Sequence, residues 1–517
     1  MIRTPEVKEV VWVQQFTERY AEKIRGVLSC LDRIVITGTI PGICFAEGMT
    51  GYLYQQGIRV FDYPQWAAGL REEIRANAEK VASKNGLQIE FIRKNTFRKE
   101  DRIKKILQER GNAPGLVHIF SAMEPCASYK PWHDKKTHKT FLKPDSGKCL
   151  HYYFYFIGAD LGLCYLRVPT WAPFRLQFYC NGHNVLASQL RRRGLSFTIL
   201  DNAMSEIEDW EKAQNLADSF SPEQLHRHLD RITRQLCPVT RHFPALYHWS
   251  LMQVEYATDI VFHRQKDLAP LYEELTRTAI HSVKPEQVAT FLGRHLSELF
   301  QDELGNDFHT RIEGTRIKHH MGRVAIKMYD KFALILRIET TANDVSFFKH
   351  HRTVEHRDQT RQMKLAPVKK TIYSLPALIG IMSAANWRYI QFISAIEDPT
   401  FSLRQLEKIS RPASDTKRTY RGFNLFHGED LDLFRAINRG EFNIHGFQNR
   451  DLHSHLISRS PQQISRVIKR LRKHGLIKKV ARTYRYYLTS LGRRVTLTAL
   501  KLREMFIIPY LRGNLTP

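Results

Sequence analysis

An amphipathic segment between residues 460 and 475 constrains the fold of this chain more than any other feature of the sequence. Ser460 and Pro461 supply a helix cap and a first-turn proline, and Gly475 supplies the stop, so the sequence predicts a helix over Pro461–His474. An apolar stripe at helical spacing runs along it, formed by Ile464, Val467, Ile468 and Leu471. This stripe requires a hydrophobic core behind the helix and leaves a polar face in front.

Further elements are expected around this helix. Two short helices are expected before it, at Leu431–Asn438 and at Asp451–Ile457, the second capped by Asn449. A hairpin of Leu476–Val480 and Tyr484–Leu488 is expected after it, and a last helix at Leu491–Phe506 closes the unit. Between Arg450 and Arg485 there are 11 Lys and Arg residues against one acid. Arginine pairs with guanine and glutamine with adenine in the major groove, whereas hairpin cations suit phosphates. The expected nucleic-acid-binding residues are Gln462, Gln463, Ser465, Arg466, Lys469, Arg470, Lys473, Lys478, Lys479, Arg482 and Arg485.

The run SPQQISRVIKRLRKHGLIKKVARTYRYYLTSLGRRV resembles the MarR-type winged helix-turn-helix. The resemblance rests on the Ser-capped recognition helix, the R-L-x-x-x-G-L-I step into the wing and the Leu-Thr-x-x-Gly that follows it. It implies a winged helix-turn-helix that binds double-stranded DNA as a dimer and regulates transcription.

Charge and cysteine content restrict the class of protein. The net charge is +27 and the pI about 9.8, which favours a polyanionic partner such as nucleic acid. The seven cysteines form no C-x-x-C pair, which argues against a zinc finger and against a secreted disulfide framework. No stretch approaches a membrane span and the N-terminus lacks the pattern of a signal peptide, so a cytoplasmic protein with no membrane partner is expected.

The rest of the chain is expected to form a mixed α/β body. Strands at Arg33–Ile40, Leu87–Ile92 and Gly115–Phe120 alternate with helices at Gln65–Asn85 and Lys99–Arg110, which favours a partly parallel sheet. Three aromatic strands follow, at His151–Ile157, Leu163–Val168 and Phe174–Cys180. The middle is expected to be helical, at Ser205–Phe220, Pro222–Leu236, Tyr247–His263 and Pro285–Leu304, with another helix at Leu375–Ile396.

These elements give the expected fold class, an α/β (α+β) multidomain protein with a mixed-sheet body, a helical middle and a C-terminal winged helix-turn-helix. The expected domains are an N-terminal α/β domain (1–148), a central body (149–407), a linker (408–424) and the winged helix-turn-helix (425–517).

The segment Tyr129–Lys148 combines lysines with Trp132 and Phe141 and contains several structure-breaking residues. The sequence predicts a loop here. Lysines interleaved with aromatic residues suit single-stranded nucleic acid, and the alternative is a solvated loop whose aromatic residues pack on the body.

Two strands near the centre carry a second set of candidate residues. Val324–Met328 and Leu334–Ile338 are expected to pair, with Arg337 and Glu339 on one face of the second strand. The order G-[ST]-R, I-x-x-Y-D-K and L-R-I-E resembles the core of plasmid-type rolling-circle replication initiators. That family uses a tyrosine for a metal-dependent nick, but the position of its nucleophile is Ile312 here. The candidate catalytic residues are therefore Tyr329 as a substitute nucleophile, with Asp330 or Glu339 holding Mg²⁺ or Mn²⁺. The alternative is a packed tyrosine and an Arg337–Glu339 salt bridge.

Taken together, the sequence predicts a DNA-binding protein that processes DNA or initiates replication for a mobile element. Two alternatives are a non-enzymatic MarR-like transcriptional regulator and an RNA-binding or RNA-guided protein. No cofactor is required by the sequence, and Mg²⁺ or Mn²⁺ enters only with the catalytic hypothesis. Double-stranded DNA is the expected partner, with single-stranded DNA or RNA as alternatives for the body, and a homodimer is compatible with the sequence.

Overall fold

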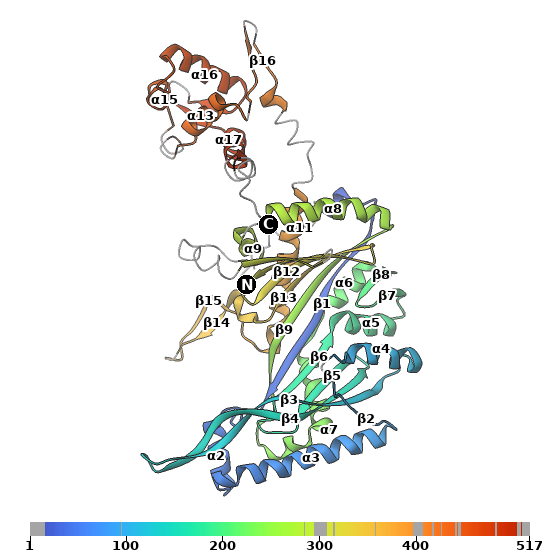
Figure 1. Ribbon diagram of the computed structural model, residues 1–517. Helices are drawn as coiled ribbons and strands as arrows, with labels where there is room; N and C mark the ends of the chain where they lie inside the picture. Colours follow the sequence, from blue (N-terminus) through green and yellow to red (C-terminus); the bar gives the residue numbers. More distant parts are fainter. Residues whose placement is uncertain are drawn as a thin grey trace. The chain divides into compact units, whose positions relative to one another are not determined.

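The computed structural model divides the chain into two compact units, residues 1–395 and 396–517 (Figure 1). It describes residues 16–503 and 508, with the exception of residues 95, 284, 294–307, 314–315, 357, 396–406, 416–417, 425, 440–441, 443–445 and 481–482. Unit 1 is a mixed α/β structure around one large sheet, and unit 2 is mainly helical.

Eleven strands form the sheet of unit 1, in the order β10-β11-β12-β13-β9-β1-β6-β5-β4-β3-β2. Two of them, β1 and β9, pair along most of their length and join the two ends of the sheet (Figure 1). The bounds are β1 Ile24–Thr39, β2 Ile89–Phe91, β3 Gly115–Asp134, β4 Lys139–Gly158, β5 Gly162–Pro169, β6 Leu176–Asn181, β9 His248–Phe262, β10 Phe308–Glu313, β11 Arg316–Met321, β12 Val324–Lys331 and β13 Ile335–Ala342.

The partly parallel sheet expected from the sequence is confirmed for one pair of strands, β2 and β3, which come from the expected segments on either side of residues 99–110. Only β2 and β3 pair in parallel, and every other pairing in the described sheet is antiparallel. Apart from α4 (Lys99–Arg110), which connects the parallel strands β2 and β3, the described helices between strands do not act as parallel crossovers. They cover its faces instead.

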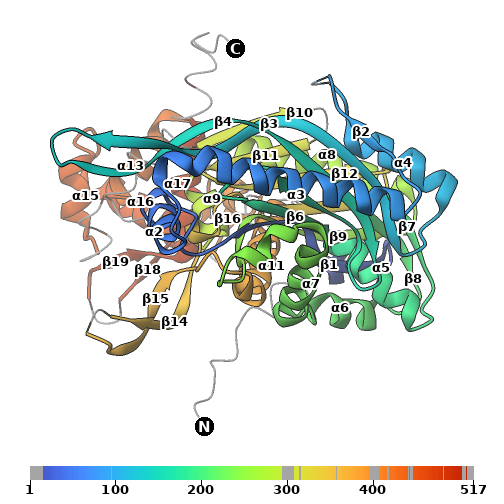
Figure 2. The same ribbon diagram turned by 90° about the horizontal axis from the view of Figure 1, so that it is seen from below.

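One face of the sheet packs against helices and holds the main core. These helices are α2 Ala46–Gln55, α3 Tyr63–Lys84, α7 Pro222–Leu236, α8 Gln265–Ser282, α9 Pro285–Phe291 and α11 Leu375–Ala395. In α3 the buried positions Tyr63, Ala67, Leu70, Ile74 and Ala78 repeat at helical spacing, and Figure 2 shows the helix lying across β3 and β4. Side chains that alternate to this face of the strands, such as Ile34, Val254 and Leu336, complete the core.

The other face is partly covered by the described helices. The helix α4 Lys99–Arg110 packs at one end through Ile103, against Phe120 and Tyr155 of the sheet. Nearer the middle of the sheet, α5 Gly182–Arg192 and α6 Trp210–Asp218 pack on β1, beside a small hairpin of β7 Phe197–Leu200 and β8 Ala203–Ile207. Between these covers the strands carry polar and aromatic side chains, and the candidate site lies there.

Three expectations for unit 1 are corrected. Residues 247–263 were expected to be helical, but the structure has β9 here. The sequence does not show the alternation typical of a half-buried strand, because residues on both sides of β9 are buried. Residues 129–148, expected to be a loop, form the paired strand ends 129–134 and 139–148 joined by a four-residue turn, with Trp132 directly opposite Phe141. The expected domain boundary, between Lys148 and Cys149, falls inside the strand β4. In addition, β1 pairs with both β6 and β9, so residues 1–148 and 149–395 belong to one sheet.

Unit 2 contains the elements expected from its sequence. They are α13 Gly428–Ile437, α15 Asn449–His455, α16 Pro461–Lys473, the hairpin of β18 Ile477–Lys479 and β19 Tyr486–Leu488, and α17 Ser490–Leu502. A capping box formed by Ser460 and Gln463 begins α16, Pro461 lies in its first turn, and Gly475 follows it with φ of 72°. The cap of α15 is Gln448 rather than Asn449.

The expected linker, residues 408–424, is part of unit 2. Ile409 and Phe423 are buried in its core, and the Phe423 amide donates to the Ile409 carbonyl at 2.9 Å. The strands β16 Ala413–Ser414 and β17 Thr419–Tyr420 form a small hairpin between them. The two ends of this segment lie so close that a Cβ atom on Gly422 would fall 1.7 Å from the Ser410 carbonyl oxygen.

Candidate functional site

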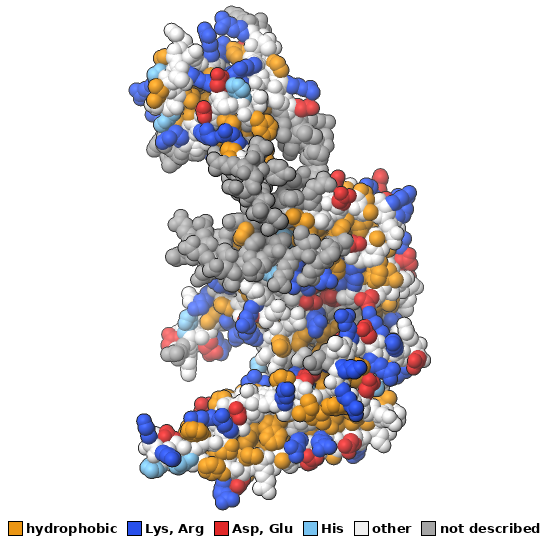
Figure 3. All heavy atoms as spheres, viewed as in Figure 1, with side chains coloured by type: hydrophobic (Ala, Val, Ile, Leu, Met, Phe, Trp, Pro, Cys, Tyr) orange, Lys and Arg blue, Asp and Glu red, His pale blue; other side chains and the backbone are white. Residues whose placement is uncertain are grey.

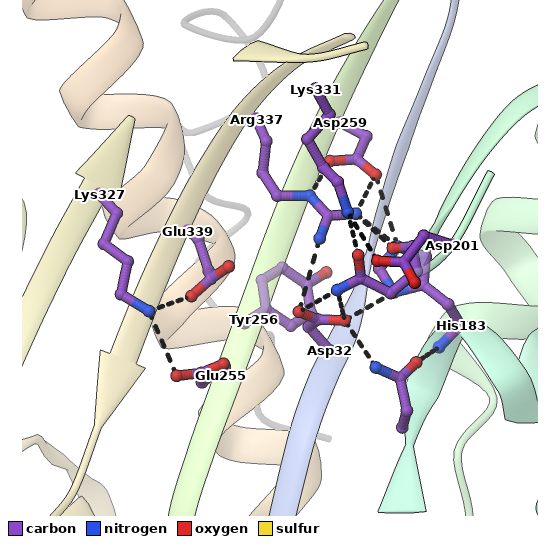
Figure 4. A network of polar contacts seen from close by, with 12 residues as sticks. Asp32, His183, Asp201, Glu255, Tyr256, Asp259, Lys327, Lys331, Arg337 and Glu339 are labelled. Carbon is purple, nitrogen blue, oxygen red and sulfur yellow. Dashed lines mark hydrogen bonds and ion pairs between the residues drawn. The ribbon is translucent and has the colours of Figure 1, made fainter. Parts of the chain in front are cut away.

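A cluster of charged side chains lies on the partly covered face of the sheet, across β12, β13, β9 and β1 (Figure 4). The register places Lys327 opposite Glu339 and Tyr329 opposite Arg337, and Arg337 in turn opposite Asp259. Alternation of side chains along each strand brings these residues to one face. Hydrophobic residues of the same strands, such as Ile326 and Ile338, alternate to the core face.

Arg337 and Asp259 form the centre of the cluster, and both are completely buried. The guanidinium donates to the two carboxylate oxygens, with distances of 2.5 Å from Nε and 2.6 Å from Nη2. The Nη2 atom also donates to the Asn202 carbonyl at 2.7 Å. Such a bidentate pair fixes the orientation of both groups and neutralises the charge that burial would otherwise make very costly.

Asp32 joins this pair from a bulge in β1. The register between β1 and β9 shifts between Leu31 and Ile34, so Asp32 lies at the irregularity. Its carboxylate accepts hydrogen bonds from Asn181 at 2.8 Å and from Asn202 at 3.0 Å, and its Oδ1 lies 3.1 Å from His183 Nδ1. The other ring nitrogen of His183 lies 3.4 Å from Asp259. A buried imidazole thus bridges two buried aspartates.

These contacts set the protonation of the three groups. Burial alone would raise the pKa of Asp32 and of Asp259, but His183 and Arg337 outweigh it and hold both values below 3.8. Burial alone would lower the pKa of His183, but the Cys30 thiol, Asp259 and Asp32 raise it well above 6.5. At neutral pH we therefore expect a charged imidazole between two ionised aspartates.

A second group of charges lies beside the first on the same face. The Lys327 ammonium donates to Glu339 at 2.5 Å and to Glu255 at 3.2 Å (Figure 4). Burial lowers the pKa of Lys327, but Glu339 and Glu255 raise it above its usual range. Burial and the neighbouring Glu339 raise the pKa of Glu255, so this carboxyl takes up a proton at a higher pH than an ordinary glutamate.

The carboxylates of Asp32, Glu255 and Glu339 each offer an oxygen, and these oxygens lie within 4.8 Å of one another. Oxygen ligands of this kind suit Mg²⁺ or Mn²⁺. However, the Lys327 ammonium already lies between the two glutamates and compensates their charge. The donor set therefore does not fit a divalent ion unless Lys327 moves away.

Two of the three expected catalytic residues meet in this cluster. The Tyr329 hydroxyl donates to Glu339 Oε2 at 2.6 Å, and the Arg316 guanidinium lies 5.2 Å from the centre of the Tyr329 ring. Burial and Glu339 raise the pKa of Tyr329, so its hydroxyl stays protonated at neutral pH. Asp330 pairs with Leu336 and alternates to the opposite face of the strand, away from the cluster. The expected Arg337–Glu339 salt bridge is replaced by two separate pairs, Arg337–Asp259 and Lys327–Glu339.

A cleft of about 720 Å³ lies next to the cluster, between the sheet, α4 and α5. Asn181 and Asn202, which both bind Asp32, line it, as do Tyr165 and Tyr179, whose rings stack at 5.2 Å. The Arg33 guanidinium lies 5.4 Å from the centre of the Tyr179 ring. The buried charges therefore lie behind a cleft with polar and aromatic walls.

Unit 2 presents the second candidate surface, on α16. Ile464, Ile468 and Leu471 are buried, as the apolar stripe predicted. The exposed expected residues of α16 are Gln462, Gln463, Ser465, Arg466, Lys469 and Lys473. Four of these have contacts within unit 2: Gln463 caps the helix, Ser465 accepts from Asn449 at 2.6 Å, Lys473 lies 3.2 Å from Asp415, and the Lys469 ammonium lies 5.9 Å from the centre of the Tyr420 ring. Gln462, Arg466 and Lys469 are exposed on the outward face of this helix.

One residue of this set is corrected. Arg470 is only 7% exposed, and its guanidinium donates to both Asp430 oxygens, at 2.8 Å and 3.0 Å, and to the Gly422 carbonyl at 2.6 Å. It holds α16 to α13 and to the 408–424 segment instead of facing outward. In the hairpin, Lys478, Lys479 and Arg485 are exposed, and Arg482 lies outside the described residues.

Sequence reasoning missed most of the central cluster. Asp32, His183, Glu255 and Asp259 were not singled out, because they lie far apart in the sequence and β9 was expected to be a helix. One signal was present: Asp32 and Asp259 are charged residues within runs of β-branched or apolar residues, LSCLDRIVI and YATDIVF. A charge in a buried strand requires a partner, although the sequence does not identify that partner.

Comparisons with known proteins give no relative for this chain: no protein-family model, no curated protein and no solved structure matches it. Among the described helices, none is both long and apolar enough to cross a membrane.

Proposed function

We propose that this protein binds duplex DNA and that unit 2 is the winged helix-turn-helix that does so. The observation that carries the proposal is the two-sided character of α16. Its apolar stripe is buried in the core of unit 2, while Gln462, Arg466 and Lys469 face outward at the spacing of one helix face. A helix of this kind, preceded by α15 and a short turn, is the element that enters the major groove in helix-turn-helix proteins.

The hairpin after α16 supports the same proposal. Lys478 and Lys479 are exposed on β18, and Arg485 is exposed next to β19, which pairs with β18 in register. In winged helices a hairpin at this position contacts the phosphate backbone. We therefore assign base recognition to α16 and sequence-independent affinity to the hairpin. Figure 3 shows many Lys and Arg side chains on the visible face of this unit.

The test is charge reversal in the full-length protein. The double variant Arg466→Glu/Lys469→Glu should lose its preference for a selected duplex site and bind all duplexes more weakly. The matched control is Arg493→Glu/Arg494→Glu, which makes the same change of charge at exposed positions of α17. Binding is measured by fluorescence anisotropy at several salt concentrations. If the two variants lost equal binding affinity, the effect would depend on net charge alone, and recognition by α16 would be refuted.

The Tyr329–Glu339 pair supports a second candidate function, the cleavage of a DNA strand in unit 1. Glu339 would take the phenolic proton as the tyrosine oxygen attacks the phosphorus, a phosphotyrosine bond would form, and the displaced sugar oxygen would leave as a hydroxyl that takes the proton. This step uses no metal, because Lys327 holds the position between the glutamates. With DNA processing added to duplex binding, the protein would suit replication initiation or mobile-element transfer.

Supercoiled and single-stranded DNA test this second function. A covalent protein–DNA adduct should form, should persist in the presence of a chelator, and should vanish in Tyr329→Phe. The control is Tyr373→Phe, at an exposed tyrosine outside the cluster that hydrogen-bonds to His226. Duplex binding without any adduct or nick would exclude strand cleavage and leave a regulator that only binds DNA.

A further inference from the structure

The pairing of β3 with β4 continues far beyond the rest of the sheet. β4 pairs with β5 only as far as His151, whereas its pairing with β3 continues to Asp134 opposite Lys139. Residues 125–148 therefore form a two-stranded ribbon, hereafter the ribbon, that extends past the sheet (Figure 1). At about 3.4 Å per residue, each strand of the ribbon is roughly 30 Å long.

One face of the ribbon is fastened to α2 and its flanking residues. The Tyr129 hydroxyl donates to the Ile43 carbonyl at 2.8 Å, and the Leu142 amide donates to Thr50 Oγ1 at 2.9 Å. Tyr129 and Leu142 are buried by this contact. Because side chains alternate along a strand, the neighbouring residues Lys130 and Lys143 belong to the opposite face, which the contact with α2 turns outward.

The outward face carries two aromatic residues flanked by lysines. Trp132 lies opposite Phe141 in the register and is 44% exposed, and the Lys143 ammonium lies 3.7 Å from the centre of the Trp132 ring. Lys130 lies directly opposite Lys143. Like charges at paired positions destabilise an antiparallel ribbon, and the exposed ion pair of Lys130 with Asp145 offsets only part of this repulsion. A polyanion on this face would compensate the repulsion.

The whole ribbon is cationic. Between residues 129 and 148 there are six lysines and two aspartates, which gives a net charge of +4 with histidines neutral. Both aspartates are already engaged: Asp134 accepts from the Lys136 amide and from Thr137, and Asp145 lies 3.6 Å from Lys130. Figure 3 shows blue Lys and Arg and pale-blue His side chains gathered at the tip of the ribbon.

We infer that the outward face of the ribbon binds single-stranded nucleic acid. Bases stack on Trp132 and Phe141, and lysines on either side contact the phosphates. A single strand fits this face better than a duplex does, because only an unpaired base presents a free surface to an aromatic side chain. This contact is separate from the duplex binding proposed for α16, since it uses unit 1 and a different form of nucleic acid.

The experiment compares single-stranded DNA with a duplex of the same sequence on the full-length protein. Stacking contributes about 1–3 kcal/mol per base, so Trp132→Ala should weaken binding of the single strand about 5- to 150-fold and leave the duplex affinity unchanged. Trp132→Phe should retain most of the affinity. Lys130→Ala/Lys143→Ala should lower the salt dependence of single-strand binding, by a log–log slope of about 0.7 for each phosphate that no longer has a lysine partner.

The matched charge control is Lys80→Ala/Lys84→Ala, two exposed lysines of α3. The inference fails if the wild-type protein does not bind the single strand, if Trp132→Ala binds it normally, or if the α3 control weakens binding as much as the ribbon variant does. Equal weakening for single strand and duplex would make the ribbon a duplex-binding surface and would also overturn the inference. Arg466→Glu/Lys469→Glu should affect only the duplex, so failure of either proposal is visible separately.

Discussion

Removal of the Arg337 side-chain charge should destabilise unit 1 strongly. In Arg337→Met, Asp259 stays completely buried and loses the two hydrogen bonds of 2.5 Å and 2.6 Å that neutralise it. Breaking a buried ion pair at one partner costs about 3–5 kcal/mol. His183 lies 3.4 Å from Asp259 and retains part of the compensation, so we expect a value in the lower half of this range.

This destabilisation can be converted to a change in melting temperature. Unfolding entropy of about 2.1 cal/mol/K per residue, applied to the 395 residues of unit 1, gives about 0.8 kcal/mol/K. A destabilisation of about 3–4 kcal/mol, the lower half of that range, therefore lowers the Tm of unit 1 by about 4–5 °C. Tryptophan fluorescence is the suitable assay, because all seven tryptophans lie in residues 1–395 and none in unit 2.

Two further variants test the reasoning. Arg59→Met removes an arginine that pairs with Asp62 at the surface, where ion pairs contribute little, and should leave the Tm unchanged. Arg337→Met/Asp259→Leu removes both buried charges and should be more stable than Arg337→Met alone. A Tm unchanged in Arg337→Met, or a double variant destabilised by the sum of the two single effects, would refute the account of Arg337 as the partner of a buried charge.

Three other predictions concern the buried ion pairs and the packing of unit 2. Neighbouring groups raise the pKa of His183 above 6.5 and hold the pKa values of Asp32 and Asp259 below 3.8, so these ion pairs contribute their full stability between pH 3.8 and 6.5. The stability that comes from charged His183 is lost as the pH rises above this window, and the stability that comes from the ionised aspartates is lost as the pH falls below it. The Tm difference between wild type and His183→Asn should thus be largest in that window and shrink at alkaline pH; a constant difference contradicts this. Arg470→Met should increase hydrogen exchange of α16 by roughly two to four orders of magnitude, because Asp430 loses its buried partner; unchanged exchange would contradict its structural role. Gly422→Ala should also loosen unit 2, since its Cβ would meet the Ser410 oxygen at 1.7 Å, whereas Gly428→Ala, where the space is open, should not; similar exchange in both variants would argue against the close approach.

The sequence predicted those features that local chemistry determines. The bounds of α4 and the start of α16 follow from caps, prolines and helical spacing within one short segment. The central cluster could not be predicted in this way. Asp32 and Arg337 are 305 positions apart, and they meet only because β1 and β13 both pair with β9. Since β9 is buried on both faces toward its end, its pattern of hydrophobic residues does not distinguish strand from helix.

The ribbon shows a different limit of sequence reasoning. Its composition indicated a basic surface with aromatic residues, but Pro, Gly and Asp within it favoured a loop. In the structure Pro131 and Pro144 lie in ribbon positions where only one partner strand is present, which a proline tolerates because its missing amide need not serve a second neighbour. The distinction matters for function, because a loop would leave Trp132 and Lys130 without a common direction, and the pairing sets them on one face.

That face is continuous with the face of the central cluster. On β3, Glu124 has the same parity as Lys130 and Trp132, and it accepts hydrogen bonds from Tyr153 and from Arg167 at 2.5 Å and 2.7 Å. Across the strands the tyrosines and Arg167 lead toward the cleft that borders Asp32. Buried ion pairs add little stability relative to apolar residues of the same shape. Stability alone therefore does not explain the charges that this face carries at Glu124 and around Arg337, on either side of the apolar residues that pack under α4.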